Sequence, residues 1–448
     1  LCALLEVGAS PSPVVRTRLD ATDGIVLGIP IGVKTSHCTN LNDSTQKPTM
    51  TSHLCSALQR SFAGLPALLI GLLISWPALA DLPHASPSAM GFSSERLKRI
   101  RPVIQREIDQ QQMPGAIVMV ARKGAVVFSD DIGVKHDAIF RAYSMTKPMV
   151  SVLAMMMVEE GQLQLADPVA KFLPALAKQT VLADPMNPQS GTVTAVRGTT
   201  VHDLLRHTSG LTYAEFTRSA AMKQAYIDAG LFSNEQPALW ITLSPAQQVE
   251  AFAKAPLQWQ PGSTWEYSLS TDMLGRVLEA VGKKPLGVML EERLIKPLGM
   301  KDTAFVVPAS KAHRIAEPLA IDPLTQKPFP PMLNLTQPQG NDSGGAGLAT
   351  TADDYLRFCQ MLLNGGTFKG KRYLSRTTIA LMTSDHLGPK VATPVQPGEL
   401  LMGVQGYTFG LGFMVRQGQG MASVPGSEGD YAWAGAGGTF FWIGRAHV

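Results

Sequence analysis

The chain has 448 residues, of which 45% are hydrophobic, so it can bury a large core and its length suggests two or three domains. Its formal charge of +4 at pH 7 includes no block of like charges. Because no basic stripe and no platform of interleaved aromatic residues occurs either, we expect a globular protein without a nucleic-acid partner.

The first 80 residues divide at Met50. Residues 1–49 carry polar and turn-forming residues without sustained periodicity, and we interpret them as an upstream segment that is untranslated or disordered. After Met50, a basic residue, an apolar run at 65–74 and an Ala-x-Ala end have the order of a signal peptide over residues 50–80. The run is shorter than the ~20 residues of a membrane-spanning helix. We therefore expect cleavage after Ala80, a periplasmic or secreted location, and no stable membrane anchor.

Cysteine usage agrees with this division, since only Cys359 follows the proposed cleavage point. A lone cysteine forms no internal disulfide, so the exported fold has to stand without one. Cys359 lies in an amphipathic helical pattern and is expected to be a core residue. No group of histidines and cysteines has metal-ligand spacing, and we predict neither a metal site nor a cofactor.

The mature chain is predicted to open with a helix and a hairpin. From Ser93 to Ile108, apolar residues recur at helical spacing, and Pro114 follows closely. Two apolar runs, 116–121 and 125–128, flank a short turn that contains glycine. This pattern predicts a β-hairpin.

Ser144 stands three residues before Lys147, so on a helix the two side chains share one face. A serine hydroxyl becomes a good nucleophile when a neighbour removes its proton, which a lysine can do only while it is partly neutral. The apolar run 148–158 predicts a buried helix that begins near Ser144, with Pro148 in its first turn, and burial disfavours an ammonium ion. Taken alone, the pair is more typical of a helix N-cap, because residues 44–47 have the same spacing by chance.

Residues 171–334 show helical patterns joined by loops rich in proline, and they predict a largely helical insertion. Within it, residues 200–211 predict a short capped helix that ends at Gly210. His207 in this segment has no acid evidently placed to orient it, so we assign it a structural hydrogen-bonding role.

Tyr267 precedes another predicted helix of the insertion. A tyrosine at such a position is usually a packing residue, and it matters for catalysis only if it reaches Ser144.

Mixed character returns after residue 334. A glycine-rich run at 343–353 leads into a helix, but it matches neither a P-loop nor a dinucleotide fingerprint. Residues 407–415 and 437–443 each predict one strand. Mixed elements at both ends with helices between them predict an α/β domain that is interrupted by an all-α domain. The proposed segments are 88–170, 171–334 and 335–448.

Three motifs resemble, in their order and separation, those of the serine β-lactamase and penicillin-binding superfamily, and within it the family VIII carboxylesterases. The motifs are Ser144-x-x-Lys147, Tyr267-Ser268-Leu269 and Trp433-Ala434-Gly435. Each is weak alone, but together they extend the resemblance over about residues 88–443. It implies a serine β-lactamase-like fold, with an antiparallel sheet flanked by helices and an inserted helical domain.

By this resemblance, Ser144 is the acylated nucleophile and Lys147 helps to deprotonate it, while Tyr267 passes the proton to the leaving group and later activates water. The N–H groups of Ser144 and Ala436 are expected to form the oxyanion hole, in which one donor is typically worth about 3 kcal/mol. The residues expected to bind substrate are Trp433, Ala434, Gly435 and Leu269.

Departures from the usual motifs indicate the activity. Class C β-lactamases and peptidases usually carry Tyr-x-Asn and Lys-Thr-Gly, whereas here Leu269 replaces the asparagine and Trp433 replaces the lysine. Without that amide and ammonium, the site lacks two groups that hold such substrates, and an aromatic wall suits a neutral ester. We therefore predict a serine carboxylesterase that acts on small-molecule short-chain acyl esters, with weak β-lactam hydrolysis. The alternatives are a β-lactamase or D-alanyl-D-alanine carboxypeptidase, and a non-catalytic ligand-binding relative.

The C-terminus also departs from the family. Members continue past the strand at 440–443 with further strands and a final helix, whereas this sequence stops at Val448. We expect an edge strand and the helix partner of residues 94–111 to be missing, as in a truncated or frameshifted gene.

Overall fold

The computed structural model describes residues 82–323, 326–328, 331–418 and 420–444. The upstream segment and the signal peptide lie outside the described residues and stay predictions. The helices are α1 (Ser94–Lys98), α2 (Ile100–Asp109), α3 (Thr146–Glu159), α4 (Val201–Leu205), α5 (Ala220–Ala229), α6 (Pro245–Lys254), α7 (Ser270–Gly282), α8 (Leu286–Leu290), α9 (Lys296–Leu298), α10 (Ala352–Leu363), α11 (Arg376–Met382) and α12 (Pro397–Met402). The strands are β1 (Ala116–Arg122), β2 (Ala125–Ile132), β3 (Phe140–Arg141), β4 (Thr180–Leu182), β5 (Thr192–Thr194), β6 (Ala349–Thr350), β7 (Thr367–Phe368), β8 (Lys371–Arg372), β9 (Tyr407–Phe409), β10 (Met414–Arg416), β11 (Tyr431–Ala434) and β12 (Phe440–Ile443).

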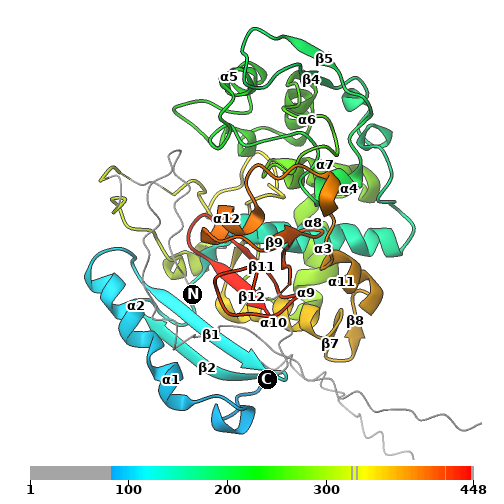
Figure 1. Ribbon diagram of the computed structural model, residues 1–448. Helices are drawn as coiled ribbons and strands as arrows, with labels where there is room; N and C mark the ends of the chain where they lie inside the picture. The colour runs from blue at the N-terminus through cyan, green and yellow to red at the C-terminus, as the bar shows by residue number, and fades with distance from the viewer. Residues whose placement is uncertain (1–81, 324–325, 329–330, 419, 445–448) are drawn as a thin grey trace, which may run out of the picture. The chain divides into compact units, whose positions relative to one another are not determined.

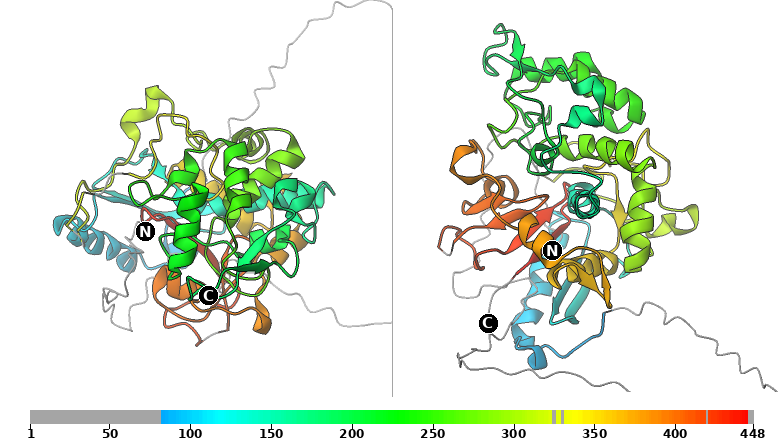
Figure 2. Two further views of the ribbon diagram at one scale, coloured as in Figure 1. Left: turned by 90° about the horizontal axis from the view of Figure 1, so that it is seen from above. Right: turned by 90° about the vertical axis from the view of Figure 1, so that its right-hand side faces the viewer.

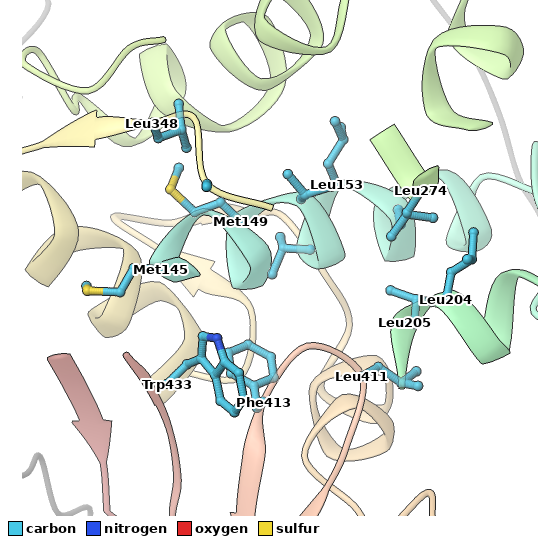
Figure 3. Packing of buried hydrophobic residues seen from close by; sticks show 14 of the residues in the cluster. Met145, Met149, Leu153, Leu204, Leu205, Leu274, Leu348, Leu411, Phe413 and Trp433 are labelled. Atoms are coloured by element: carbon cyan, nitrogen blue, oxygen red, sulfur yellow. The ribbon is translucent and has the colours of Figure 1, made fainter. Parts of the chain in front are cut away.

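Helix α3 is the element around which the others pack. Residues 146–157 of this helix are all buried, as expected for a helix that is apolar on every side. Figures 1 and 2 show α3 between the orange-to-red sheet β9–β12 and the green helix α7. In Figure 3, Leu274 of α7 lies on one side of α3, and Phe413 and Trp433 from the sheet region lie on another. Side chains from α7 and from the sheet region thus pack against α3 from different directions.

The beginning of α3 agrees with the sequence prediction. A 3-10 turn, Tyr143–Met145, leads into the helix at Thr146, and Pro148 lies in the first turn, where it needs no N–H partner. The Thr146 hydroxyl accepts a hydrogen bond from the Leu348 N–H at 3.1 Å. This bond ties the first turn of α3 to the segment before β6.

The main sheet has the antiparallel order β12-β11-β10-β9, and β1 and β2 form a separate antiparallel pair. The prediction of one strand over residues 407–415 is wrong, because β9 and β10 are two arms of a hairpin. Its turn is closed by a 2.8 Å hydrogen bond from Gly410 N–H to Phe413 C=O. Gly412 has φ +89° in this turn, and a Cβ there would lie 2.3 Å from Ser151 Oγ of α3. Glycine thus lets the turn approach the central helix.

Two helical segments also differ in detail from the prediction. The N-terminal pattern, which we expected to form one helix, is divided into α1 and α2 at Arg99. Helix α4 ends at Leu205, before the predicted end at Gly210. Two residues after it have a left-handed backbone, His207 with φ 57° and Gly210 with φ 87°. Gly210 has its own constraint, since a Cβ there would lie 2.1 Å from the Trp259 carbonyl oxygen.

Between residues 171 and 334 the chain forms helices α4 to α9 and the short hairpin β4–β5. Residues from Leu82 onward belong to one compact unit, and the domain boundaries at residues 170 and 334 stay predictions. Cys359 is buried in α10, which confirms its expected place in the core. Across the described part of the chain, no helix is both long enough and apolar enough to cross a membrane.

Candidate active site

Ser144 is presented by an unusual backbone turn. The preceding residue, Tyr143, has φ 43°, a left-handed conformation that typically costs a non-glycine residue about 1–3 kcal/mol. Tyr143 and Met145 are buried, whereas Ser144 between them is partly exposed. The turn therefore directs a hydroxyl outward from an otherwise buried segment.

Two proton-carrying groups meet the Ser144 hydroxyl. Lys147 Nζ donates to Ser144 Oγ at 3.2 Å, and the Tyr267 hydroxyl donates to the same oxygen at 2.5 Å. The Lys147 side chain is 1% exposed and its Nζ lies 4.7 Å from the centre of the Tyr267 ring. The condition set for Tyr267 from the sequence, that it reach Ser144, is met in the structure.

Further hydrogen bonds fix the Lys147 amine. Lys147 Nζ donates to the Tyr213 hydroxyl at 3.1 Å and to the Gly345 carbonyl at 2.9 Å. Burial raises the pKa of Tyr213 well above its ordinary value, and the neighbouring Tyr267 and Asp272 raise it further. Tyr213 therefore remains a neutral phenol, whose oxygen can accept from the amine.

A buried carboxyl group supports the carbonyl that Lys147 contacts. Asp272 Oδ1 accepts from the Ser343 hydroxyl at 2.5 Å and from the Gly345 N–H at 3.2 Å. A Cβ on Gly345 would lie 2.2 Å from Asp272 Oδ2, so only glycine fits there. Burial raises the pKa of Asp272, and the charge of Lys147 acts in the opposite direction. Asp272 thus anchors the backbone N–H of Gly345, the residue whose carbonyl oxygen accepts from the Lys147 amine.

Aromatic rings surround Tyr267. The ring centres of His207 and Trp433 lie 5.1 and 5.4 Å from that of Tyr267. His207 Nδ1 lies 3.0 Å from Ser268 Oγ, and burial, followed by the charge of Lys147, lowers the pKa of His207 well below its ordinary value. His207 is therefore a neutral hydrogen-bonding residue that packs against Tyr267.

The residues expected to bind substrate differ in exposure. Trp433 is 0% exposed and Leu269 is 1% exposed, so neither side chain is presented to solvent. Trp433 instead packs between Tyr267 and Phe409, whose ring centre lies 5.1 Å away. Ala434 is buried at the end of β11. The contact of Trp433 with Tyr267 is direct, whereas its contact with substrate stays a prediction.

The turn after β11 lies against the backbone that carries Ser144. A Cβ on Gly435 would lie 2.4 Å from the Ala142 carbonyl oxygen, and one on Gly437 would lie 2.8 Å from the Tyr143 ring. Ala436 is exposed between these two glycines. The absence of side chains on both neighbours thus brings the Ala436 peptide next to the Ser144 turn.

A sequence profile of the β-lactamase family matches residues 100–447. The chain belongs to the β-lactamase family. It is 34% identical over 357 residues to Protein Rv1367c of Mycobacterium tuberculosis, covering 75% of this chain and 84% of that protein. It is 27% identical over 391 residues to Esterase EstB of Burkholderia gladioli, covering 80% of this chain and 90% of that protein.

Solved structures agree with this β-lactamase-family assignment. EstCE1, described as a hydrolase with promiscuous acyltransferase activity, matches with a TM-score of 0.60 and 26% identity, over 78% of this chain and 90% of that one. The resemblance and the mixed α/β, β-lactamase-like fold predicted from the sequence are confirmed, whereas the expectation about the C-terminal strands and helix stays a prediction.

Two polar residues of this β-lactamase-family site were missed by the sequence analysis. Tyr213 follows the segment around His207 by a few residues, and Asp272 lies five residues after Tyr267. Nothing in the sequence indicated that Asp272 is buried or that it meets Gly345. That contact depends on a segment more than 70 positions away, as the Ser343 bond illustrates.

Proposed function

We propose that this chain is a serine carboxylesterase that hydrolyses short-chain acyl esters through an acyl-enzyme on Ser144. One observation carries the proposal: Ser144 Oγ lies 3.2 Å from Lys147 Nζ and 2.5 Å from the Tyr267 hydroxyl. Membership of the β-lactamase family and similarity to EstB and EstCE1 support a serine hydrolase of this kind.

The acylation step uses both proton carriers. Lys147, while neutral, helps to take the proton from Ser144, and Oγ forms a bond to the ester carbonyl carbon. The carbonyl oxygen gains negative charge, which the N–H groups of Ser144 and Ala436 stabilise. Tyr267 then delivers a proton to the alcohol oxygen as the C–O bond breaks. The alcohol leaves and Ser144 remains acylated.

Deacylation reverses the proton flow. A water molecule takes the place of the alcohol, and Tyr267 accepts its proton as the water oxygen attacks the acyl carbon. The bond to Ser144 Oγ breaks, the carboxylic acid is released, and Lys147 returns to Oγ the proton that it took during acylation, so that both groups regain their starting state. The contacts of Lys147 with Tyr213 and Gly345 hold the amine in place throughout.

The surroundings of Tyr267 favour an ester over a β-lactam or a peptide. At the position of the usual lysine, Trp433 presents a buried indole against the Tyr267 ring at 5.4 Å, and Leu269 is buried at the position of the usual asparagine. These two residues offer no ammonium for a substrate carboxylate and no side-chain amide for a substrate amide. A neutral ester requires neither group.

A comparison of substrates tests this preference. We expect kcat/KM for p-nitrophenyl butyrate to exceed that for a chromogenic cephalosporin by at least about a hundredfold, because each missing polar partner in a buried site weakens recognition strongly. A much higher efficiency with the cephalosporin would reject the esterase and favour the β-lactamase alternative.

Active-site labelling tests the nucleophile. A fluorophosphonate probe should label the wild-type protein and fail to label Ser144→Ala, because the probe reacts with an activated serine oxygen. Ser263→Ala, which changes an exposed serine in a turn, serves as the matched control and should keep full labelling. A folded wild-type protein that takes up no label would favour the non-catalytic binder.

A further inference from the structure

A cavity of about 170 Å³ lies beside the turn that carries Ala436. Tyr143, which precedes the nucleophile, and Ala436, whose N–H is a proposed oxyanion-hole donor, both line it. The remaining wall comes from the open end of the β1–β2 hairpin, from β3 and from the chain around residues 316–332. It includes Val134, Phe140, Ala316, Leu319 and Met332. The cavity therefore adjoins the candidate active site without belonging to the Lys147 cluster.

The wall of this cavity is mostly apolar, with two buried charged residues of opposite sign, Arg141 and Asp322, among its lining. Arg141 donates from Nε to the Leu333 carbonyl at 2.8 Å, and its guanidinium lies 3.0 Å from the Glu317 carboxylate. A guanidinium held by a carboxylate and a carbonyl has little attraction left for an anionic ligand. The aliphatic and aromatic side chains around it favour an uncharged hydrocarbon group.

The mouth of the cavity has the same character. Ile321 and Met332 line it and are 47% and 46% exposed, which is unusual for large apolar side chains. Tyr143 connects this rim to the nucleophile, since its phenol is buried and interacts with the Met332 backbone. A hydrocarbon chain that enters the cavity would cover these exposed side chains.

The direction of the reaction decides which part of an ester the cavity can take. When Ser144 Oγ is bonded to the carbonyl carbon, the alcohol arm must face Tyr267, which protonates it, and the oxyanion must face Ala436. The described lining of the cavity includes Tyr143 and Ala436 but neither Ser144 nor Tyr267, so a chain bonded to Ser144 would reach the cavity past Tyr143 and Ala436. The cavity is thus placed for the acyl arm.

We propose that this cavity, here named the acyl cavity, binds the hydrocarbon chain of the acyl group, so that the preferred substrates are neutral esters of straight-chain acids with about six carbons. An apolar protein cavity of about 150 Å³ can hold the six carbons of benzene. A cavity of about 170 Å³ therefore has room for a chain with a similar number of carbons. The inference rests on the proposed esterase function and adds the length and chemistry of the acyl group.

The test measures kcat/KM for p-nitrophenyl acetate, butyrate, hexanoate and octanoate with three variants. Val134→Trp fills the acyl cavity, and Leu319→Ala enlarges it. Val288→Trp adds the same indole to an exposed position of α8 as the matched control. Each methylene group removed from water changes kcat/KM by about fourfold, so the wild-type values should rise steeply from acetate to hexanoate.

We expect Val134→Trp to keep acetate turnover within about threefold while hexanoate turnover falls at least about tenfold, because at least two methylene groups lose their place. Leu319→Ala should move the optimum toward octanoate, and Val288→Trp should keep the wild-type profile. If Val134→Trp loses acetate turnover as well, the chain-length optimum of Leu319→Ala becomes the test of whether the cavity binds the acyl chain.

Failure of this inference differs from failure of the proposed function. Active protein whose chain-length profile is unchanged in Leu319→Ala would overturn the acyl cavity and leave the esterase intact. A response of Leu319→Ala to longer alcohol groups, as in hexyl acetate against methyl acetate, would overturn the acyl assignment and give the cavity to the alcohol. Wild-type protein that hydrolyses none of these esters would reject the function itself.

Discussion

The two sides of Ser144 are built in different ways. On the side of the proposed base, here called the base side, side-chain hydrogen bonds hold the groups in place, as in the contacts of Lys147 with Tyr213 and of Tyr267 with Ser144. On the side of the proposed oxyanion hole, here called the oxyanion side, the backbone approaches closely because Gly435 and Gly437 lack side chains. Turnover should therefore respond to the removal of one hydroxyl group on the base side, and to the addition of one methyl group on the oxyanion side.

The largest effect is expected on the base side. Tyr267→Phe removes only the hydroxyl that lies 2.5 Å from Ser144 Oγ. Loss of a general acid and base should lower kcat by about a hundredfold or more, while KM changes little. Steady-state kinetics with p-nitrophenyl butyrate provide the measurement, and near-normal turnover would remove Tyr267 from the mechanism.

A smaller effect is expected on the oxyanion side. Gly435→Ala places a Cβ 2.4 Å from the Ala142 carbonyl oxygen and 2.4 Å from Thr439 Oγ1, so the turn must move away from Ser144. Because an oxyanion-hole donor acts mainly in the transition state, kcat should fall by roughly 10- to 100-fold. Gly198→Ala adds the same methyl group where no heavy atom lies within 4 Å, and turnover should stay within about threefold. Equal losses in both variants would argue against the special role of position 435.

This contrast also explains what the sequence could predict. Ser144, Lys147 and Tyr267 were recognisable because three motifs, each weak alone, resemble in their joint order those of a known family, and the meeting of these side chains is observed. Asp272 was not recognisable, because it belongs to no motif and its contact is with the backbone N–H of Gly345. The side chains proposed to react belong to motifs that can be read in the sequence, whereas a side chain that binds a backbone N–H, as Asp272 does, has no such motif.

The fold shows the same limit at the level of strands. Residues 407–415 have the composition of one strand, yet Gly410 and Gly412 turn the chain back to form β9 and β10. The reason lies in tertiary packing, since Gly412 must pass close to Ser151 of α3. In contrast, α3 itself was predictable, because a helix that is apolar on all sides and has a proline in its first turn has few alternatives.

A supporting contact of the base side gives the third prediction. Tyr213→Phe removes the hydroxyl that accepts from Lys147 Nζ at 3.1 Å. Because a hydrogen bond typically contributes about 0.5–1.5 kcal/mol and this one holds the amine in place, kcat should fall by up to about tenfold. Tyr226→Phe removes another buried tyrosine hydroxyl, which accepts from the Thr212 N–H at 3.2 Å. If Tyr226→Phe lowers kcat as much as Tyr213→Phe, the loss reflects the fold and not the amine.

The smallest effect on catalysis is expected for Glu215, which lies beside the base side without joining it. Phe216, the next residue, stacks on Tyr267 with ring centres 6.2 Å apart. Burial raises the pKa of Glu215 from 4.5 to about 7, and the charge of Lys223 opposes this only in part. Between pH 4.5 and 7 the unfolded chain releases this proton while the folded protein retains it, so stability falls as pH rises through that range and is level above it.

Glu215→Gln removes this titration and should therefore gain stability relative to the wild type as pH rises. The difference in unfolding free energy between the two proteins should increase by on the order of 2 kcal/mol from pH 4.5 to pH 8. Thermal unfolding at intervals across this range measures it, with Glu235→Gln as a control at an exposed glutamate. Turnover of p-nitrophenyl butyrate should stay within about twofold, because no proton in the mechanism passes through Glu215. Parallel stability curves for wild type and Glu215→Gln would show that the carboxyl ionises freely in the folded protein, and a large loss of kcat would place Glu215 on the base side after all.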